Sequence, residues 1–499
     1  MTVLLKKLRA YLGTLIAGER NTVPDSISGC GVKVAKIGPG AMFIAFDDEE
    51  NDGVEHIAEA VERGAAVIAT VVPFDELPDC AKKVGYFKIE RPTLFAARAA
   101  ELFAGFPAEK LKLYSITGTN GKTTSAMLMH NILERRYGAA GLISTVGCRC
   151  GGDMIQTGYT TPPPFVTQEL FSEMVSRGIK AAALENSSHG LDQFRTSGAL
   201  FDGAIFTNLT GDHLDYHKTM ENYYAAKRRM FTELVKPDGG AAVINIDDPW
   251  GARLLDEIRE LGVRSFGFGR AAAADFRISG VECSSSGTKF ALETRDYGRI
   301  EVDASLCGEH NVYNMTGVLA AALETGIPKE TVLAAFASGV QVPGRLERIS
   351  DGRIDCFVDY AHTDDALERV LTAVRPWCRG RLIVVFGCGG NRDRSKRPRM
   401  GHAAAGLADV AIVTSDNPRC ENPADIIADI LPGTVGGKAE ILVEPDRRKA
   451  IELALSGVAR PGDIVLIAGK GHENYQEING NRSHMDDREE ARKWLGRKH

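Results

Sequence analysis

The chain lacks the long apolar runs of a membrane protein and the paired cysteines of a disulfide-rich or zinc-binding protein. No segment reaches the roughly 18 apolar residues that a membrane-spanning helix needs. The ten cysteines are scattered with no CxxC pair, and Cys148 and Cys150 have no second cluster to complete a zinc site. We therefore expect reduced thiols and a cytoplasmic protein without membrane insertion.

The N-terminus lacks the uninterrupted apolar core of a signal peptide. Lys6, Lys7 and Arg9 interrupt the apolar residues of segment 1–17, so we expect an amphipathic helix there. A large excess of one charge is also absent, because the net charge is −6 over 499 residues. Such a balance gives no electrostatic reason to expect nucleic acid or an anionic membrane as a partner. A short basic run at 392–399 is a local exception that this balance does not explain.

The length of 499 residues exceeds a single hydrophobic core and predicts about three domains. Hydrophobic residues make up 44% and charged residues 25%, which is typical of a globular enzyme. The strand and helix pattern breaks near 104–108 and again near 342–344. We therefore expect domains at 1–104, 105–341 and 342–499.

Short apolar runs alternate with helical patterns along most of the chain, which predicts an α/β fold with mainly parallel sheets. Segment 264–304 has fewer helical patterns, so a small antiparallel excursion is expected there. The last region is typical of a doubly wound domain, in which ligands bind beyond the carboxyl ends of the strands. Strands are expected at 41–46, 65–71, 111–116, 141–146, 180–184, 203–207, 241–246, 356–360, 382–386, 410–414 and 464–468, and helices at 57–63, 126–133, 166–175, 223–234 and 311–323.

A glycine-rich turn follows the apolar run at 111–116 and precedes a helical pattern. A strand, a glycine turn and a helix N-terminus together form a cradle of backbone N–H groups for phosphate. Lys122 adds a positive charge, and the Thr123 hydroxyl stands where the Mg²⁺ of a nucleotide triphosphate is held. The spacing is shorter than the Walker pattern, because Ile116 stands where that pattern has its first glycine. The turn, Gly118, Thr119, Asn120, Gly121, Lys122, Thr123 and Thr124, predicts ATP binding.

Polar side chains follow the next two predicted strands of the middle region. Glu185 ends one apolar run and is suited to Mg²⁺, which prefers hard oxygen ligands. His213 follows the other strand, in a position that makes a second metal ligand or an ordinary surface histidine possible. Lys227 lies on a predicted helix, where a solvated lysine is the default reading.

Three loops in the last region also follow predicted strands. Arg392 follows the glycine run after one strand, and Arg419 offers a planar fork that matches a carboxylate. Lys470 and Glu473 follow the final strand. Arginine for a carboxylate and glutamate for an ammonium suit a zwitterionic ligand, although three unrelated surface loops would have the same composition.

Several ordered motifs resemble the Mur ligases, in particular the branch that adds the third residue of the peptidoglycan stem peptide. The resemblance extends from about Gly40 to the C-terminus. Its motifs are the loop at 117–124, Ser-Ser-His-Gly-Leu at 187–191, Asn-Leu-Thr at 208–210, Asp-His-Leu-Asp-Tyr-His at 212–217, Ala-Lys at 226–227, Gly-Arg at 344–345, Asp-Tyr-Ala-His-Thr at 359–363 and Asp-Asn-Pro-Arg at 416–419.

This resemblance implies a three-domain architecture with an N-terminal domain for the UDP end, a central P-loop ATPase domain and a C-terminal Rossmann-like domain for the amino acid. It implies ATP and Mg²⁺ as cofactors. Lys122 would act in catalysis, Glu185 and His213 would be metal ligands with Thr123, and Lys227 would carry CO₂ as a carbamate that also binds metal. Asn311 and Arg345 would contact the nucleotide, and Asp359 its ribose.

The same resemblance implies two small-molecule substrates and an acyl-phosphate route to an amide bond. The acceptor, a UDP-N-acetylmuramoyl dipeptide, would bind at Thr160, Thr161, Ser187, Gln193 and Arg195. The incoming amino acid would bind at Arg392, Asp416, Asn417, Pro418, Arg419, Gly469 and Glu473. The Asp-Asn-Pro-Arg form resembles the version that selects meso-diaminopimelate, with Arg419 on its second carboxylate. We expect the protein to act as a monomer.

Three positions depart from the family pattern. Lys33-Val34-Ala35 stands where Asp-Ser-Arg is usual, Asn186 replaces a small apolar residue, and Tyr159 replaces histidine or asparagine. The first and third concern the UDP-sugar substrate, so a ligase for L-lysine or for another acceptor is the alternative. A nucleotide-dependent switch or kinase is an alternative from another class, as is a non-catalytic interaction partner. Amine-dependent phosphate release would separate the ligase from both.

Overall fold

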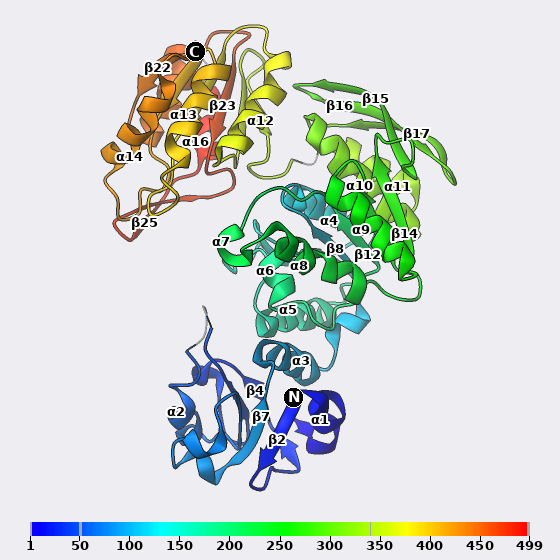
Figure 1. Cartoon of the computed structure of the whole chain (residues 1–499). Coiled ribbons are helices and arrows are strands. Elements are labelled where there is room, and N and C mark those ends of the chain that lie inside the picture. The colour runs from blue at the N-terminus through cyan, green and yellow to red at the C-terminus, as the bar shows by residue number, and fades with distance from the viewer. Residues whose placement is uncertain (1, 49–51, 340, 497–499) are drawn as a thin grey trace. The chain divides into compact units, whose positions relative to one another are not determined.

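The structure is a computed structural model that describes residues 2–48, 52–339 and 341–496. It divides into two compact units. Figure 1 shows the helices and strands in chain order, from blue at the N-terminus to red at the C-terminus. The first comprises Met1–Arg277, Glu293–Gly298 and Tyr313–Val332, and the second Ile278–Leu292, Arg299–Val312 and Leu333–His499. Strands and helices alternate through both units, as the sequence predicts for an α/β fold.

The first unit begins with a five-stranded sheet, whose strands β5 and β6 are fully buried. The helix expected over 1–17 is shorter than predicted: α1 covers Leu5–Leu12, and Ile16–Arg20 is strand β2, paired antiparallel with β7. Pairing along a strand edge overrides the helical pattern there. The strand order is β2, β7 (Gly85–Ile89), β6 (Val67–Thr70), β5 (Met42–Ala45) and β4 (Cys30–Gly31), with helices α2 (Ile57–Glu62) and α3 (Pro92–Ala104).

A larger sheet follows, and it positions the phosphate loop. Its central strands are almost wholly buried, which explains their continuous apolar runs. Strands β8, β11, β12 and β13 are parallel, so their carboxyl ends meet at one edge. The order is β10 (Gly147–Cys150), β9 (Gly141–Ser144), β11 (Ala181–Glu185), β8 (Lys112–Thr117), β12 (Gly203–Phe206), β13 (Ala241–Asn245), β14 (Ser265–Gly269) and β15 (Phe276–Ser284).

The predicted helices of this region form, with ends shifted by a few residues. The sequence prediction began the helix after the phosphate loop at Ala126, whereas α4 begins at Lys122. The start of α4 is difficult to predict from the sequence, because its N-cap residue is Gly121, which has no side chain to cap the helix. The helices are α4 (Lys122–Tyr137), α5 (Pro164–Ser176), α6 (Ser188–Asp192), α7 (Leu214–His217), α8 (Met220–Glu233), α9 (Pro249–Glu260), α10 (Glu309–Glu324) and α11 (Lys329–Ala337).

The expected antiparallel excursion is also present. Strands β15, β16 (Gly287–Thr294) and β17 (Gly298–Ala304) follow one another with connections of two and three residues. Connections this short join antiparallel neighbours, because parallel strands need a crossover. Strand β14 pairs parallel with both β13 and β15, and β16 and β17 continue the same sheet.

The second unit contains a six-stranded sheet with a core on each face. Side chains of β20 alternate between the two cores, with Leu382, Val384 and Phe386 in one and Ile383 and Val385 in the other. Only the edge strand β18 is antiparallel, as its pairing with β19 shows. The order is β18 (Glu347–Ser350), β19 (Asp355–Asp359), β23 (Ile464–Ala468), β20 (Leu382–Phe386), β21 (Val410–Val413) and β22 (Glu440–Val443).

This sheet gathers three loops at the carboxyl ends of β20, β21 and β23, where doubly wound sheets bind ligands. A hairpin near the C-terminus, β24 (Tyr475–Ile478) and β25 (Asn481–His484), contacts one of these loops through the bridge between Arg419 and Ile478. The helices are α12 (Asp364–Val374), α13 (Lys396–Leu407), α14 (Pro423–Ile430), α15 (Arg447–Glu452) and α16 (Asp487–Leu495).

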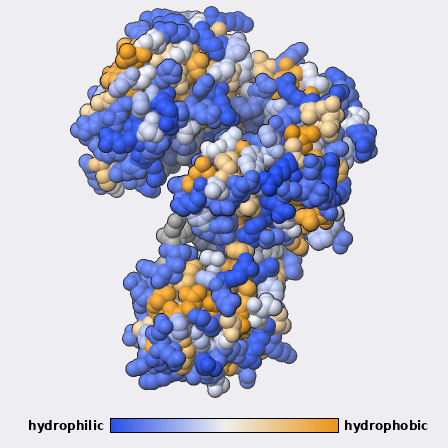
Figure 2. Space-filling view, in the orientation of Figure 1, coloured by the Kyte–Doolittle hydropathy of each residue, from blue (hydrophilic) through white to orange (hydrophobic). Residues whose placement is uncertain are grey.

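The surface is mostly hydrophilic in the face shown in Figure 2, with apolar residues in separate patches. Within the described ranges, no helix is both long enough and apolar enough to span a bilayer.

Candidate active site

The phosphate loop is held open by two glycines that accept no side chain. Gly118 and Gly121 have φ values of +150° and +85°, which favour glycine. A Cβ on Gly118 would lie 1.9 Å from Thr207 Oγ1, and one on Gly121 would lie 2.2 Å from Asn314 Oδ1. The loop therefore packs closely against Thr207 and Asn314. Its backbone N–H groups lie at the start of α4, the end of a helix that binds anions such as phosphate.

Lys122 and Thr123 are the first two residues of α4, directly after the phosphate loop. Lys122 Nζ donates to the carbonyl oxygens of Gly118 and Thr119 at 3.0 and 2.8 Å. Thr123 Oγ1 donates to Glu185 Oε2 at 3.0 Å, so the structure brings together two of the four predicted metal ligands. Helix and loop thus present a cation and a hydroxyl from adjacent residues.

Glu185 is fully buried at the end of β11, and within the described ranges its side chain accepts hydrogen bonds from uncharged groups. Besides Thr123, its oxygens accept bonds from the hydroxyl of Ser144 and from the N–H and hydroxyl of Thr145. The Thr123 and Glu185 oxygens are the hard ligands that Mg²⁺ prefers, so this pair fits the cation.

Lys227 is almost completely buried on α8, which the sequence alone did not indicate. Its Nζ donates to the Gly118 carbonyl at 2.8 Å and lies 4.6 Å from the centre of the Tyr223 ring. Burial, together with the nearby Lys122 charge, holds the pKa of this amine well below its ordinary value. Within the described ranges, Lys227 has no carboxylate partner at salt-bridge distance.

His213 is exposed at the N-terminus of the short helix α7, with a positive φ of 53°. Its ring centre lies 4.9 Å from that of His189, and Asp212 lies 3.5 Å from its Nε2. Partial burial lowers the pKa of the imidazole, and Asp212 opposes this shift. The ring is therefore mainly neutral near pH 7, the form in which histidine binds a metal.

Beside the phosphate loop lies a cavity of about 300 Å³. All five residues predicted for the acceptor line it, and so do Lys122, Lys227 and His213. Its lining is Lys122, Gly158, Tyr159, Thr160, Thr161, Ser187, Ser188, His189, Gln193, Arg195, His213 and Lys227. Residues that the sequence assigned separately to phosphate chemistry and to the acceptor therefore share one cavity.

The acceptor side of this cavity is held by hydrogen bonds between loops. Thr161 Oγ1 donates to the Glu185 carbonyl at 2.9 Å and accepts from the Ser187 N–H at 2.9 Å. Arg195 donates to Gln193 Oε1 at 2.6 and 2.9 Å and to the Thr161 carbonyl at 2.9 Å. Thr160 bonds the hydroxyl of Thr145 at 2.8 Å. Thr161, Ser187, Gln193 and Arg195 are connected by these bonds, and Thr160 joins them through Thr145 and Glu185.

Two of the three departures from the family pattern are explained by their contacts in the structure. Asn186 is fully buried and links Ser115 Oγ, at 3.0 Å, with Thr196 Oγ1, at 3.1 Å. Its amide therefore satisfies two buried hydroxyls. Tyr159 stacks against Arg195, with the guanidinium 5.4 Å from the ring centre.

Ser188 and His189 line the cavity, although neither was among the predicted site residues. The Ser188 hydroxyl is buried with no hydrogen-bond partner in the described structure. The His189 ring lies 4.2 Å from Tyr216 and 5.5 Å from His217, between ring centres. The Ser-Ser-His motif contained the signal, but only the fold shows that the second serine and the histidine face the cavity.

Asn311, Arg345 and Asp359, predicted for the nucleotide, belong to the second unit. Asn311 is buried on α10 and donates to the Cys307 carbonyl at 2.8 Å. Asp359 ends β19 and accepts from the N–H groups of Leu346 at 2.7 Å and Ala361 at 2.9 Å. Burial raises its pKa, and the neighbouring Arg345 opposes that shift.

The residues predicted for the amino acid meet in the second unit. Asn417 Nδ2 donates to Glu473 Oε2 at 2.8 Å, and the buried Lys470 donates to both of them at 3.1 Å. A Cβ on Gly469 would lie 2.6 Å from Asp416 Oδ2, so these two loops touch. The loops after β21 and β23 are thereby locked together.

Arg392 and Arg419 approach each other at Gly389. A Cβ added to Gly389 would lie 3.0 Å from Arg419 Nη1 and 3.8 Å from Arg392 Cγ. Arg419 has a positive φ of 53°, and its backbone bonds to Glu477 and Asn479 hold it there. Pro418 precedes it and accepts a bond from the Glu421 N–H at 3.0 Å. The Arg419 guanidinium and the aliphatic stem of Arg392 therefore both lie beside Gly389.

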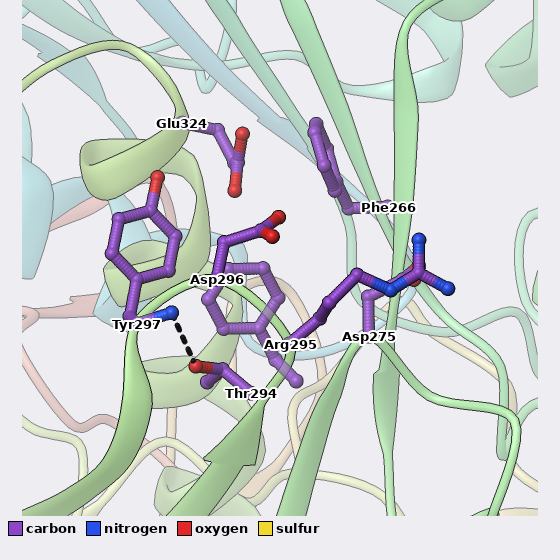
Figure 3. Close-up of a pocket in the computed structure, with 8 residues that line it drawn as sticks. Phe266, Asp275, Thr294, Arg295, Asp296, Tyr297 and Glu324 are labelled. Carbon is purple, nitrogen blue, oxygen red and sulfur yellow. Dashed lines mark hydrogen bonds between the residues drawn. The ribbon is translucent and has the colours of Figure 1, made fainter.

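A second, smaller hollow of about 40 Å³ lies where the β16–β17 turn meets β14 (Figure 3). It is lined by aromatic rings and by the carboxylates of Asp275, Asp296 and Glu324. Arg259 pairs with Asp275 at 3.2 Å, and Arg264 pairs with Glu324. Its volume has room for a water or two and not for a nucleotide.

Two family descriptions match this chain. The family description "Mur ligase middle domain" matches residues 116–322, and "Mur ligase, glutamate ligase domain" matches residues 344–471. A UDP-N-acetylmuramoyl-L-alanyl-D-glutamate--2,6-diaminopimelate ligase of Gloeobacter violaceus is 41% identical, covering 99% of this chain and 98% of the relative. The ligase of the same name from Geobacter sulfurreducens is 41% identical, with 95% of each chain covered.

A solved structure of a ligase with that name resembles the fold over 99% of both chains. Its TM-score is 0.73 and its sequence identity is 31%.

Proposed function

Because the chain belongs to the Mur ligase family, we propose that it joins meso-diaminopimelate to UDP-N-acetylmuramoyl-L-Ala-D-Glu in an ATP-dependent reaction of peptidoglycan biosynthesis. Relatives that match it along nearly its whole length bear the name of this ligase. The observation that carries the proposal is the cavity of about 300 Å³ shared by Lys122, Lys227 and the acceptor residues. One cavity with both sets suits transfer of a phosphoryl group to a bound acceptor.

The proposed reaction passes through an acyl phosphate. The acceptor carboxylate attacks the γ-phosphorus of ATP, and ADP leaves. The neutral amine of the amino acid then attacks the acyl carbon, and phosphate leaves from the tetrahedral intermediate. Lys122 and the loop N–H groups stabilise charge on the transferred phosphoryl oxygens, while Thr160, Thr161 and Arg195 orient the acceptor.

Mg²⁺ fits the buried oxygen pair of Thr123 and Glu185, and His213 and a carbamylated Lys227 would complete its ligands. Bound there, the cation would neutralise charge on the phosphate oxygens. Carbamylation is supported by the burial and lowered pKa of Lys227, because only a neutral amine adds CO₂. The modified side chain is a carboxylate, which removes the cost of a buried ammonium next to Lys122.

For the second unit, we propose that Arg392 and Arg419 bind carboxylates of meso-diaminopimelate and that Asp416, Asn417, Gly469 and Glu473 bind the rest of its zwitterion. The Asp-Asn-Pro-Arg turn includes Pro418 as its rigid element. Asn311, Arg345 and Asp359 would bind the nucleotide. The domain boundaries proposed are 1–104, 105–341 and 342–499, and the protein is proposed to act as a cytoplasmic monomer without nucleic acid.

Phosphate release by the purified protein tests this proposal. The reaction contains ATP, Mg²⁺ and UDP-N-acetylmuramoyl-L-Ala-D-Glu, with meso-diaminopimelate, L-lysine or no amine. Release with meso-diaminopimelate alone is expected. Release without any amine would indicate a phosphatase or kinase activity, and release with lysine alone would assign a different amino acid. If no phosphate is released with either amine, either the proposed acceptor or the proposed reaction is wrong.

A further inference from the structure

The basic run at 392–399 is largely neutralised by acids of the second unit. Arg394 and Arg397 both contact Asp429, at 2.8 and 2.9 Å, and Arg399 contacts Asp364 at 2.7 Å. Among the described residues, Arg392 is the arginine of this run for which no acidic partner is found within salt-bridge distance. The run therefore serves mainly to hold structure, and it leaves one arginine for a ligand.

Arg397 differs from the other arginines of the run because it is completely buried. It lies in the first turn of α13, where the helix dipole disfavours a cation. Two carboxylates offset this cost: Nη1 donates to Asp429 Oδ2 at 2.9 Å, and Nη2 donates to Glu421 Oε1 at 2.9 Å. Arg394, in contrast, has 66% of its side chain exposed.

The contacts of Arg397 lead to both loops that carry the predicted amino-acid residues. Glu421, three residues beyond Pro418, also accepts the Asn391 N–H, and the bond from Arg397 lowers the pKa of this carboxyl. The Gly389 carbonyl lies 3.5 Å from Arg397 Nη2, a long contact. One guanidinium therefore touches the loop after β20 and the loop after β21.

The loop after β20 and the loop after β21 are also joined directly to each other by hydrogen bonds. The Gly390 N–H donates to the Asn417 carbonyl at 2.9 Å, and Arg419 Nη1 donates to the Gly390 carbonyl at 2.7 Å. The Cys420 N–H donates to Asn391 Oδ1 at 3.0 Å. A shift of either loop would break these bonds and separate Arg392 from Arg419.

We propose that Arg397 is the positioning residue of the amino-acid pocket: by binding Glu421 and Asp429 it fixes the two loops in the register that places Arg392 and Arg419 beside Gly389. The proposal rests on the proposed function for the identity of the ligand. Arg397 is buried and acts through other residues, so it does not itself touch the amino acid.

Steady-state kinetics of Arg397→Lys and Glu421→Gln test this role, with Arg394→Ala as the matched control that also contacts Asp429. Lysine keeps the charge but lacks the fork that spans two carboxylates. The KM for meso-diaminopimelate should rise about tenfold in both variants, the loss expected for a charge-assisted hydrogen bond. The KM for ATP and for the acceptor should stay within about twofold of wild type, and Arg394→Ala should match wild type.

Hydrogen exchange gives a readout that does not depend on activity. The amides of Gly390, Asn391 and Cys420 should lose protection in Arg397→Lys and Glu421→Gln and keep it in Arg394→Ala. Unchanged protection, or a lower melting temperature with an unchanged KM for the amino acid, would overturn the positioning role. If the wild-type protein releases no phosphate with meso-diaminopimelate, the proposed function is wrong. Hydrogen exchange then remains as the test of whether Arg397 holds the two loops in place.

Discussion

The phosphate side of the first unit and the amino-acid side of the second hold their charged residues in opposite ways. Lys227 and Glu185 are buried among hydroxyls, backbone groups and an aromatic ring, and Lys122 donates to two carbonyls. In the second unit, Lys470 bonds Glu473, and the fully buried Arg447 bonds Asp487 at 2.7 and 2.8 Å.

This difference follows the chemistry proposed for each side. The Glu185 carboxylate, held by hydroxyls and a backbone N–H, offers its oxygens to a metal. In the second unit, pairs of opposite charges such as Lys470 and Glu473 hold the loops in place. Recognition of the amino acid is then left to a few groups such as Arg392. The first side should therefore fail when one residue is lost, whereas the second should depend on a network.

The largest effect is expected on the phosphate side. Lys122→Ala should lower kcat for phosphate release about 10³-fold, because it removes the charge that stabilises the transferred phosphoryl group. Lys110→Ala, an exposed lysine outside the loop, serves as the control and should match wild type. A loss below about tenfold in Lys122→Ala would show that this lysine is not required, and the contrast between the two regions would not hold.

Removal of Arg419 tests the other region. Arg419→Ala should raise the KM for meso-diaminopimelate about 100-fold, because a charge-assisted contact with a carboxylate is lost. The KM for ATP should change little. Arg353→Ala, which removes an exposed pair with Asp351, is the control in the same unit. An unchanged KM in Arg419→Ala would remove this arginine from the pocket.

The backbone of the phosphate loop should be sensitive to a single methyl group. In Gly121→Ala, the new Cβ combines a positive φ with a position 2.2 Å from Asn314 Oδ1, at a cost of about 2–3 kcal/mol. Gly211→Ala is the matched control, since a Cβ there meets no atom within 4 Å. Thermal unfolding and kcat measure both variants, and equal behaviour of the two would contradict the close approach.

The second unit should lose stability in acid through His472. Burial and the nearby Arg345 lower its pKa to about 4, so its folded form stays neutral where the unfolded form, with a pKa near 6.5, takes up a proton. Stability is thus fully present above pH 6.5 and is lost as the pH falls toward 4. The loss between pH 7.5 and pH 5 should be up to about 2 kcal/mol.

Denaturant titrations at the two pH values, with His472→Asn as the comparison, measure this effect. The variant should be less stable at pH 7.5 and less sensitive to pH. An equal pH dependence in both proteins would assign the acid loss to other groups.

The smallest effect is expected at Tyr159. Tyr159→Ala removes the ring that stacks on Arg195, so the KM for the acceptor should rise about threefold. Tyr159→Phe keeps the ring and should leave that KM unchanged. Equal effects of the two substitutions would mean that the hydroxyl, and not the stacking, matters.

The strands were predictable because their apolar runs are buried on both faces, as at 382–386 and 464–468, where the predicted and observed bounds coincide. The helix expected over 1–17 was not, because pairing of Ile16–Arg20 with β7 depends on residues far along the chain. Local patterns do not contain such distant contacts.

The candidate site shows the same limit. The phosphate loop could be recognised from its strand, glycines and helix. Lys227 looked like a solvated lysine, and only its burial against the Gly118 carbonyl distinguishes it. The cavity walls at Ser188 and His189, and the role of the basic run in pairing loops, likewise depend on which segments meet in space.

The most direct measurement is the selectivity ratio, kcat/KM for meso-diaminopimelate divided by that for L-lysine, in wild type, Arg419→Ala and Lys122→Arg. If the two regions have the separate tasks described, Lys122→Arg slows both reactions and keeps the ratio, whereas Arg419→Ala collapses the ratio toward one. A ratio that survives in Arg419→Ala, or changes in Lys122→Arg, would contradict that division of tasks.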